Sequence, residues 1–282
     1  MHGKAWTVLG PIEPSQLGIT ITHEHLLIDE VPVYFQLPEQ ATQRMLSRHP
    51  VTLDILGWLR FNPDFNEDNL RLDDEDMMAE EIIRFRLAEG RTIVDATSVG
   101  LGRDAAGLRR LSLRTGINLI TGSGYYVAAS HPPDMESKDV DDIQDEIVKD
   151  IRLGIQDTGV RAGLIGEIGT TFPWTPNEQK VLRGAARAQL ETGAPMEVHP
   201  GTNRKMRFVL IGTSSLSHSL EMMASYSCLA SWSCFARSLQ ILPFLVISVI
   251  PAIRSCSISF ASPTSAASGT KLRSISEGSM SI

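Results

Sequence analysis

Residues 18–27 read GITITHEHLL, the first of five short apolar runs with the length and composition of buried strands. The four similar runs lie at residues 92–97, 118–122, 162–168 and 194–199. Helical patterns separate these runs, at residues 75–89, 104–115, 140–153 and 176–192. Strands that alternate with helices in this way predict repeated βα units and a parallel sheet.

The helix expected at residues 176–192 has the clearest boundaries of the set. Thr175 can cap its first turn, Pro176 suits the first helical position, and Glu178 stands where a capping box has an acidic residue. Gly193 is expected to end the helix. The sequence therefore predicts both ends of this helix.

The spacing of the units favours a barrel. Five βα units occupy about 200 residues, and the eight units of a (β/α)₈ barrel need about 250. We therefore predict an α/β fold, a (β/α)₈ TIM barrel that is incomplete at about five units, with a doubly wound sheet as the alternative. Five strands cannot close a barrel, so we expect unpaired edges at the first and fifth strands, which residues 241–253 could cover.

The composition is that of a soluble globular protein and excludes several classes. The chain has 282 residues, 42% of them hydrophobic and 21% charged, with a formal net charge of -7. No five basic residues run together, so we expect no nucleic-acid partner. The apolar run at residues 241–253 is too short for a membrane span. Without a signal-peptide pattern or a cysteine framework, the chain is expected to be cytoplasmic and to have no membrane partner.

The strongest chemical signal is the pair of histidines in the sequence THEH at residues 22–25. Alternate residues of a strand point to one face, so His23 and His25 are expected there, about 6.6 Å apart along the backbone. Two imidazoles at this spacing can share a metal ion. The alternative is a pair of surface or hydrogen-bonded histidines. Apolar neighbours make a surface strand less favourable, and two buried imidazoles without partners would be costly.

Two further residues stand where a barrel enzyme places its ligands. His199 ends the fifth run, and active sites of such barrels lie at the carboxyl ends of the strands. Glu167 interrupts the apolar run GLIGEIG at residues 163–169, where a charge must be paired or metal-bound and the glycines allow close approach of other groups. A loop histidine and a glutamate paired with arginine are the alternatives. Together with His23 and His25, these residues fit one divalent-metal site.

Short motifs in a fixed order connect these residues to a known family. They lie at residues 7–10 (TVLG), 17–18 (LG), 22–26 (THEHL), 94–97 (VDAT), 102–104 (GRD), 122–127 (GSGYYV), 163–169 (GLIGEIG) and 198–201 (VHPG). In order and spacing they resemble the phosphotriesterase family, especially its phosphotriesterase-related branch, within the amidohydrolase superfamily of metal-dependent (β/α)₈ hydrolases. The resemblance covers residues 1 to about 204.

The resemblance implies a site with two divalent metal ions. His23 and His25 would hold the more buried ion, Glu167 would bridge the two ions in place of the carboxylated lysine of some relatives, and His199 would hold the second ion. Histidine and carboxylate ligands suit Zn²⁺, with Mn²⁺ or Co²⁺ as alternatives. The neighbours Tyr125 and Tyr126 would either line the substrate pocket or fill the barrel rim.

The implied activity is hydrolysis of an ester or amide bond in a small-molecule substrate through a metal-bridging hydroxide. The substrate could be a phosphotriester, a lactone or another carboxylic ester or amide. Dimers are common in the family, so the resemblance also implies a homodimer.

Two elements of the family pattern are missing from the later part of the chain. The family supplies a histidine from strand six and an aspartate from strand eight, but no Asp follows Asp157 and the surroundings of His218 match no family motif. No catalytic residue is therefore predicted. The alternatives to an active hydrolase are an inactive truncated barrel with partial metal binding and a mononuclear amidohydrolase such as a deaminase.

The composition changes abruptly near Arg204. Residues 1–204 contain 7 Ser and 20 Lys and Arg against 31 Asp and Glu, whereas residues 205–282 contain 20 Ser and 6 Lys and Arg against 2 Glu. We divide the chain into a partial barrel at 1–204 and a Ser-rich segment at 205–282 that does not match the family. We hypothesise that a shifted reading frame or a mis-joined exon produced this segment, with a divergent C-terminal domain as the alternative.

This hypothesis predicts a family-like continuation in another reading frame. Sequencing of the transcript across codons 200–210 should reveal the shift or the faulty junction. A clean transcript in a single frame that encodes a folded protein would contradict it.

Overall fold

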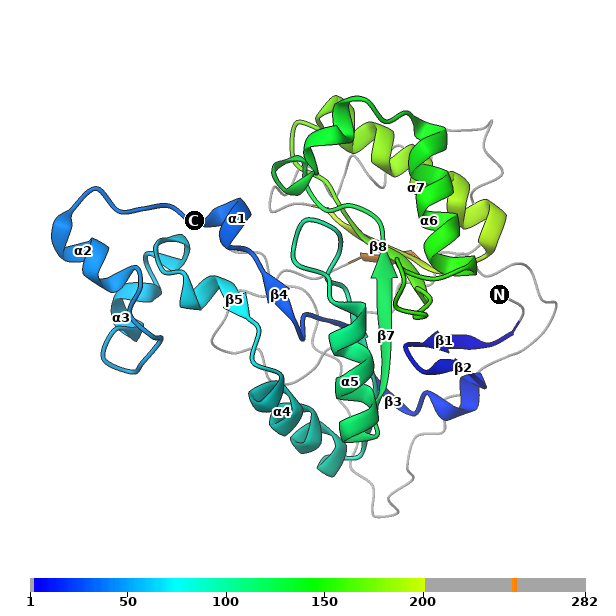
Figure 1. Cartoon of the computed structure of the whole chain (residues 1–282), viewed down its shortest axis with the longest axis horizontal. Coiled ribbons are helices and arrows are strands. Elements are labelled where there is room, and N and C mark those ends of the chain that lie inside the picture. The colour runs from blue at the N-terminus through cyan, green and yellow to red at the C-terminus, as the bar shows by residue number, and fades with distance from the viewer. Residues whose placement is uncertain (1–2, 201–244, 248–282) are drawn as a thin grey trace, which may run out of the picture. The chain divides into compact units, whose positions relative to one another are not determined.

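A six-stranded sheet organises the computed structural model, which describes residues 3–200 and 245–247 (Figure 1). Its five parallel strands pair in chain order: β3 (Ile19–Glu24), β6 (Gly90–Asp95), β7 (Asn118–Ser123), β8 (Leu164–Gly169) and β9 (Met196–His199). Each overlaps a run that the sequence predicted, with ends that differ by up to three residues. A doubly wound sheet would reverse its strand order at a switch point, and this order does not reverse. The α/β fold of an incomplete (β/α)₈ barrel is therefore confirmed.

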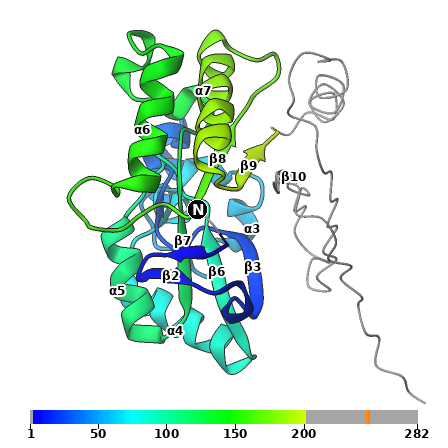
Figure 2. The same ribbon diagram turned by 90° about the vertical axis from the view of Figure 1, so that its right-hand side faces the viewer.

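Four long helices connect the parallel strands, as predicted: α4 (Glu75–Leu87), α5 (Ala105–Thr115), α6 (Val140–Arg152) and α7 (Pro176–Thr192). Helix α4 packs on β6, α5 and α6 pack on β7, and α7 packs on β8 and β9. Figure 2 shows α5 and α6 along the same side of β6 and β7. Their inward faces form the main core, whose largest fully buried side chains include Ile82, Leu108, Leu111, Leu119, Ile143, Ile147 and Ile165.

The boundaries predicted for α7 are confirmed at both ends. The Thr175 side chain accepts a hydrogen bond from the Glu178 N–H, and Glu178 bonds back to the Thr175 N–H at 2.9 Å. Gly193 ends the helix in the left-handed conformation, with φ at 67°. The other three long helices begin at aspartate caps that the sequence analysis did not single out: Asp74, Asp104 and Asp139.

The edge of the fifth strand is paired over a short stretch. Strand β10 (Leu245–Ile247) lies antiparallel to β9, with Leu245 opposite Val198. The expectation that residues 241–253 could cover this edge is met by these three residues. The next strand of a regular (β/α)₈ barrel would be parallel, so β10 does not have the direction of a sixth barrel strand. Strand β3 ends the sheet on its other side within the described residues. Of the Ser-rich segment at 205–282, only residues 245–247 belong to the described part of the chain. The predicted division of the chain near residue 204 and the predicted origin of this segment stay predictions.

Several short elements escaped the sequence analysis. A hairpin of β1 (Ala5–Thr7) and β2 (Gly10–Ile12) precedes β3, and β4 (Ile28–Asp29) pairs with β5 (Arg71–Leu72). Between these last two lie α1 (Val31–Tyr34), α2 (Ala41–Leu46), α3 (Leu56–Leu59), and the 3₁₀ helices η2 (Pro63–Phe65) and η3 (Asp68–Leu70). The remaining 3₁₀ helices are η1 (Pro14–Gln16), η4 (Ala128–Ser130) and η5 (Pro133–Glu136). Strands of two or three residues and helices of three to six residues are too short to repeat their hydrophobic period, which is why the sequence did not predict them.

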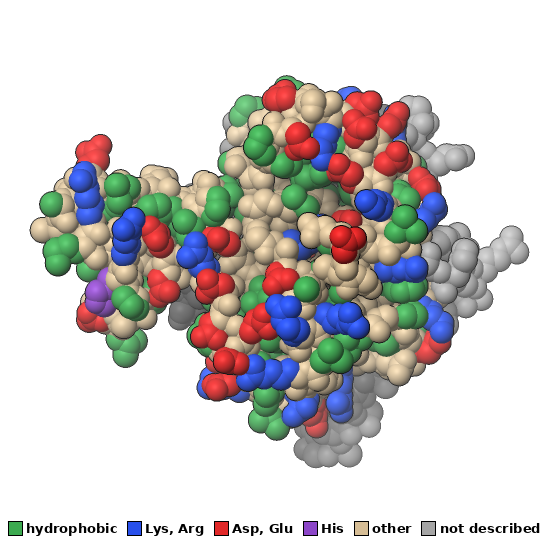
Figure 3. Space-filling view, viewed as in Figure 1, with side chains coloured by type: hydrophobic (Ala, Val, Ile, Leu, Met, Phe, Trp, Pro, Cys, Tyr) green, Lys and Arg blue, Asp and Glu red, His purple; other side chains and the backbone are tan. Residues whose placement is uncertain are grey.

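Charged side chains join the long helices on their outer faces. Acidic groups gather over α6 and α7 in Figure 3 and are mixed with Lys and Arg elsewhere on that face. Arg152 of α6 pairs with Glu191 of α7 at 2.7 Å, and Arg110 of α5 pairs with Glu75 of α4 at 2.5 Å. Exposed pairs of this kind stabilise a fold by about 0–1 kcal/mol each, so the core carries most of the helix packing. None of the helices in the described part is both long and apolar enough to cross a bilayer.

Candidate metal centre

The four predicted ligands meet at the carboxyl ends of the parallel strands. His23 lies near the end of β3 and His25 just after it, Glu167 lies in β8, and His199 is the last residue of β9. In a flat sheet β3 and β8 would stand about 14 Å apart, because β6 and β7 lie between them. The side chains of His25 and Glu167 nevertheless approach to 3.4 Å. The sheet therefore curls strongly enough to bring the four residues together.

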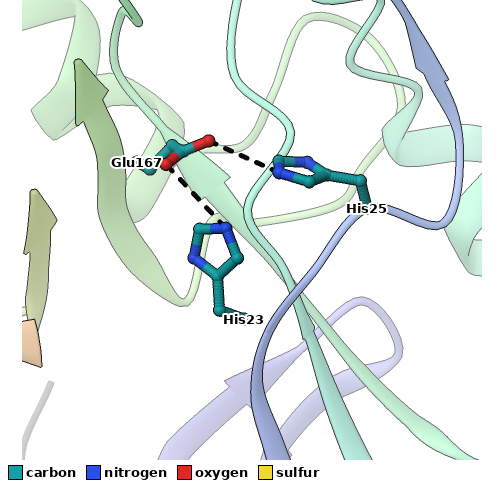
Figure 4. Close-up of side chains that lie close together, drawn as sticks. All are labelled: His23, His25 and Glu167. Carbon is teal, nitrogen blue, oxygen red and sulfur yellow. Dashed lines mark ion pairs between the residues drawn. The ribbon is translucent and has the colours of Figure 1, made fainter. Parts of the chain in front are cut away.

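The Glu167 carboxylate stands at the centre of the cluster, with its side chain only 2% exposed. Nε2 of His25 lies 3.4 Å from its Oε1, and Nε2 of His23 lies 3.8 Å from its Oε2. Figure 4 shows both rings pointing towards this carboxylate. His199 contacts the same group, with its Nδ1 2.9 Å from Oε2. Three imidazoles thus converge on one buried carboxylate.

The spacing of these atoms suits a divalent cation. The ligand atoms of His23, His25 and Glu167 all lie within 4.8 Å of one another. Two ligands of a tetrahedral ion with bonds of 2.0–2.1 Å lie about 3.4 Å apart, close to the two distances between these imidazoles and the carboxylate. The set of nitrogen and carboxylate donors is also the one that zinc and similar ions prefer. These residues could therefore hold a metal ion, and within residues 3–200 no other acidic, His or Cys cluster has this spacing.

Each histidine also contacts a second side chain through its other ring nitrogen. Nδ1 of His23 lies 2.5 Å from Oε1 of Glu197, Nδ1 of His25 lies 3.0 Å from Oγ1 of Thr97, and Nε2 of His199 lies 3.2 Å from the hydroxyl oxygen of Tyr126. Each ring therefore turns one nitrogen to Glu167 while the other is engaged elsewhere. Outer partners of this kind fix the orientation of metal-binding histidines in proteins.

The protonation of the two histidines on β3 differs because their surroundings differ. Burial lowers the pKa of His25 to about 4, although the Glu167 carboxylate opposes the shift. For His23 burial also favours the neutral ring, but the hydrogen bond and charge of Glu197, with the charge of Glu167, outweigh burial and raise the pKa. A neutral His25 offers the free electron pair that metal binding requires.

The glycine before Glu167 allows β8 and β9 to approach closely. Gly166 has a φ of 128°, and a Cβ atom at this position would lie 2.5 Å from the carbonyl oxygen of Glu197. At Gly169 a Cβ atom would lie 2.3 Å from the backbone nitrogen of Val127. The prediction that the glycines around Glu167 permit close approach is confirmed.

Three residues of the cluster's surroundings were not predicted. Thr97 and Glu197 contact the histidines directly. Asp95, at the end of β6, is fully buried, and its two oxygens accept hydrogen bonds from the N–H groups of Leu26 and Thr97. Burial raises the pKa of Asp95 to about 7, against the effect of these hydrogen bonds. Asp95 thereby ties the chain after β3 to the end of β6 and sets His25 beside Thr97.

A sequence signal for two of these residues was present. Asp95 and Glu197, like Glu167, are acidic residues inside runs that are otherwise apolar, where a charge needs a partner. Glu197 also stands two residues before His199 in a strand, and alternation along a strand places both side chains on one face. Thr97 gave no comparable signal, because a buried threonine is common in strands.

The two neighbouring tyrosines have different surroundings. The Tyr126 hydroxyl contacts His199, and the two rings pack edge to face with centroids 5.0 Å apart. The Tyr125 hydroxyl instead donates a hydrogen bond to Glu146 and accepts one from Lys138 at 3.0 Å. Only Tyr126 of this pair touches the cluster. His218 lies outside the described residues.

The chain matches a model of the phosphotriesterase family over residues 3–213. An N-acetyltaurine hydrolase of Xenopus tropicalis is 40% identical over 212 residues, which are 75% of this chain and 60% of the relative. A phosphotriesterase-related protein of Nematostella vectensis is 38% identical over 201 residues, or 71% of this chain and 57% of the relative. The chain thus spans about 60% of the length of the curated relatives it matches.

Solved structures show the same likeness. A resiniferatoxin-binding protein from Rhodobacter sphaeroides is 42% identical with a TM-score of 0.71, covering 76% of this chain and 60% of its own. A lactonase from Listeria monocytogenes is 26% identical with a TM-score of 0.56, covering 76% and 62%. The phosphotriesterase homology protein from Escherichia coli, complexed with phosphate in its active site, is 28% identical with a TM-score of 0.53, covering 70% and 59%.

The close approach at Gly166 predicts a large effect of a single methyl group. We expect Gly166→Ala to lower the free energy of unfolding by more than the roughly 1–3 kcal/mol that its backbone conformation costs a non-glycine residue, because the new Cβ also clashes with Glu197. Gly57→Ala is the control, since a Cβ there meets no atom within 4 Å. Urea denaturation measures both, and equal stability of the two variants would contradict the account of this strand pair.

Proposed function

The chain belongs to the phosphotriesterase family, and on this premise we propose that it is a metal-dependent hydrolase of ester or amide bonds. The observation that carries the proposal is the convergence of three imidazoles on the buried carboxylate of Glu167. A buried carboxylate surrounded by imidazole nitrogens has the ligand atoms that a divalent metal ion prefers. The cluster lies at the carboxyl ends of the strands, where barrel enzymes carry out their chemistry.

We assign four ligands to two cations. His23 and His25 present Nε2 to the carboxylate and would share one ion, while His199 presents Nδ1 and would bind the other. Both oxygens of Glu167 face imidazoles, which supports a bridging role for this residue. Zinc is the metal we propose, because imidazole and carboxylate ligands suit it, with manganese or cobalt as substitutes.

When bound, two divalent cations would polarise a substrate oxygen and make a nucleophile available from water near neutral pH. The protein side chains hold the ligands in place. The Tyr126 hydroxyl holds Nε2 of His199, Thr97 holds Nδ1 of His25, and Asp95 anchors the backbone on both sides of that contact. Fixed ligands need no reorganisation as the reaction proceeds, which lowers the barrier.

An apolar cluster adjoins the metal centre, and the names of two similar proteins suggest the substrate class. Leu101, Tyr126 and Val127 are buried together, with Ile28, Val33 and Tyr34 packed against them. Tyr126 belongs both to this cluster and to the surroundings of His199. A relative that shares 40% identity is named an N-acetyltaurine hydrolase, and one structural neighbour is a lactonase. We therefore propose a small N-acyl amide as substrate, with a lactone as the next candidate and a phosphotriester last.

An inactive metal-binding barrel is the second candidate function. It is favoured by one feature of the sequence, the lack of any Asp after Asp157, since the family supplies a metal-binding aspartate from strand eight. The cytoplasmic location, the homodimer and the altered origin of residues 205–282 stay predictions from the sequence.

Metal content and turnover together test the proposed function. We expect the purified chain, loaded with zinc and dialysed, to hold two zinc ions and to hydrolyse N-acetyltaurine, an aryl acetate or a simple lactone. His25→Ala and Glu167→Ala should each lose at least one ion and all turnover, because each removes a donor from the cluster. His49→Ala, which changes a histidine outside the cluster, should retain both.

Elemental analysis and a hydrolysis assay give distinct outcomes. Zinc content equal to the wild type in both cluster variants would contradict the site. Bound zinc without turnover on any of these substrates would reject the hydrolase and favour the inactive barrel.

A further inference from the structure

The Glu197 side chain joins the two outermost strands of the parallel sheet. His23 belongs to β3, the first of the five parallel strands, and Glu197 belongs to β9, the last. In a flat sheet these strands would lie about 19 Å apart. The Glu197 carboxylate nevertheless lies 2.5 Å from Nδ1 of His23. This contact therefore spans the inside of the curled sheet.

The carboxylate of Glu197 is as deeply buried as that of Glu167. Its side chain is 3% exposed, and the His23 ring is the ion-pair partner that the structure gives it within residues 3–200. A buried carboxylate is costly unless a charged group or hydrogen-bond donor meets it. The Nδ1–H of His23 satisfies this need, so the proton of this ring is held on Nδ1 and the electron pair on Nε2.

This contact differs in kind from those of the other two histidines. Thr97 and Tyr126 offer neutral hydroxyl groups to His25 and His199. Of these three contacts on the ring nitrogens that face away from Glu167, the one to His23 is made by a carboxylate. A hydrogen bond to an ionised acceptor is shorter and about twice as strong as a neutral one. Rotation of the His23 ring would break this bond and leave the buried Glu197 charge unsatisfied.

We propose that Glu197 is a positioning residue of the metal centre, whose carboxylate holds Nδ1 of His23 and presents Nε2 to the cation shared with His25 and Glu167. The inference rests on the proposed function, because it requires that the cluster bind a metal. Glu197 itself is not a ligand in this arrangement. It acts through His23, and its removal should weaken metal binding before any substrate is present.

A cobalt titration of the metal-free 282-residue chain tests this role. Bound Co²⁺ is followed by its visible absorption, which reports both affinity and ligand geometry. Loss of an outer partner of a metal-binding histidine costs about 10- to 100-fold in affinity. We expect Glu197→Gln, which keeps the shape and an acceptor oxygen, to lose about 10-fold in Co²⁺ affinity. Glu197→Ala, which keeps neither, should lose about 100-fold. The absorption bands at saturation should also shift in both variants.

Glu178→Gln is the matched control, because it also replaces a buried carboxylate by an amide but does so away from the metal centre. Glu178 is also fully buried, but its oxygens accept hydrogen bonds from Ala128, Thr171 and Thr175, away from the histidines. We expect this variant to melt at a lower temperature and to bind Co²⁺ with wild-type affinity and spectrum. Circular dichroism of each metal-free variant establishes that it is folded, and Glu197→Gln keeps the test decisive if Glu197→Ala does not fold.

The outcomes separate this inference from the proposed function. Wild-type affinity and spectrum in Glu197→Gln would overturn the positioning role, as would an equal loss of affinity in Glu178→Gln, which would trace the effect to stability. A wild-type chain that binds no Co²⁺ would instead overturn the proposed function, and the positioning role with it.

Discussion

The buried charge of Glu167 is the constraint on which the rest of the centre depends. A carboxylate inside an apolar strand needs charged or hydrogen-bonding partners. Three histidines from two other strands surround that of Glu167, with His199 at hydrogen-bond distance and His23 and His25 at 3.8 and 3.4 Å. The imidazole nitrogens that face this carboxylate are also the atoms that a divalent cation would bind. Stability of the strand ends and metal binding are therefore two uses of one set of side chains.

The curl of the sheet and the site depend on each other. Strands β3 and β9 stand at opposite ends of the parallel sheet, yet Glu197 of one reaches His23 of the other. Gly166 lets the backbone of β9 lie against β8, which brings Glu197 and Glu167 towards the same interior. In the described part of the chain, the polar contacts inside the curl thus hold together strands that share no backbone hydrogen bonds.

Strand and helix patterns predicted much of this arrangement, because each long element repeats its own period. The run at 162–168 gave β8, and the caps Thr175 and Gly193 gave both ends of α7. His23 and His25 could be predicted as a pair because strand alternation places them on one face. The contact of Glu197 with His23 could not, because it depends on how far the sheet curls, and no local pattern encodes that distance. The short elements around α2 were missed because they are too brief for a period to show.

Anomalous diffraction at the zinc edge, from crystals of the chain grown with zinc, tests the central claim most directly. We expect a peak about 2.0–2.2 Å from Nε2 of His23, from Nε2 of His25 and from an oxygen of Glu167. A zinc peak bound elsewhere, or these three side chains directed apart around an empty interior, would contradict it.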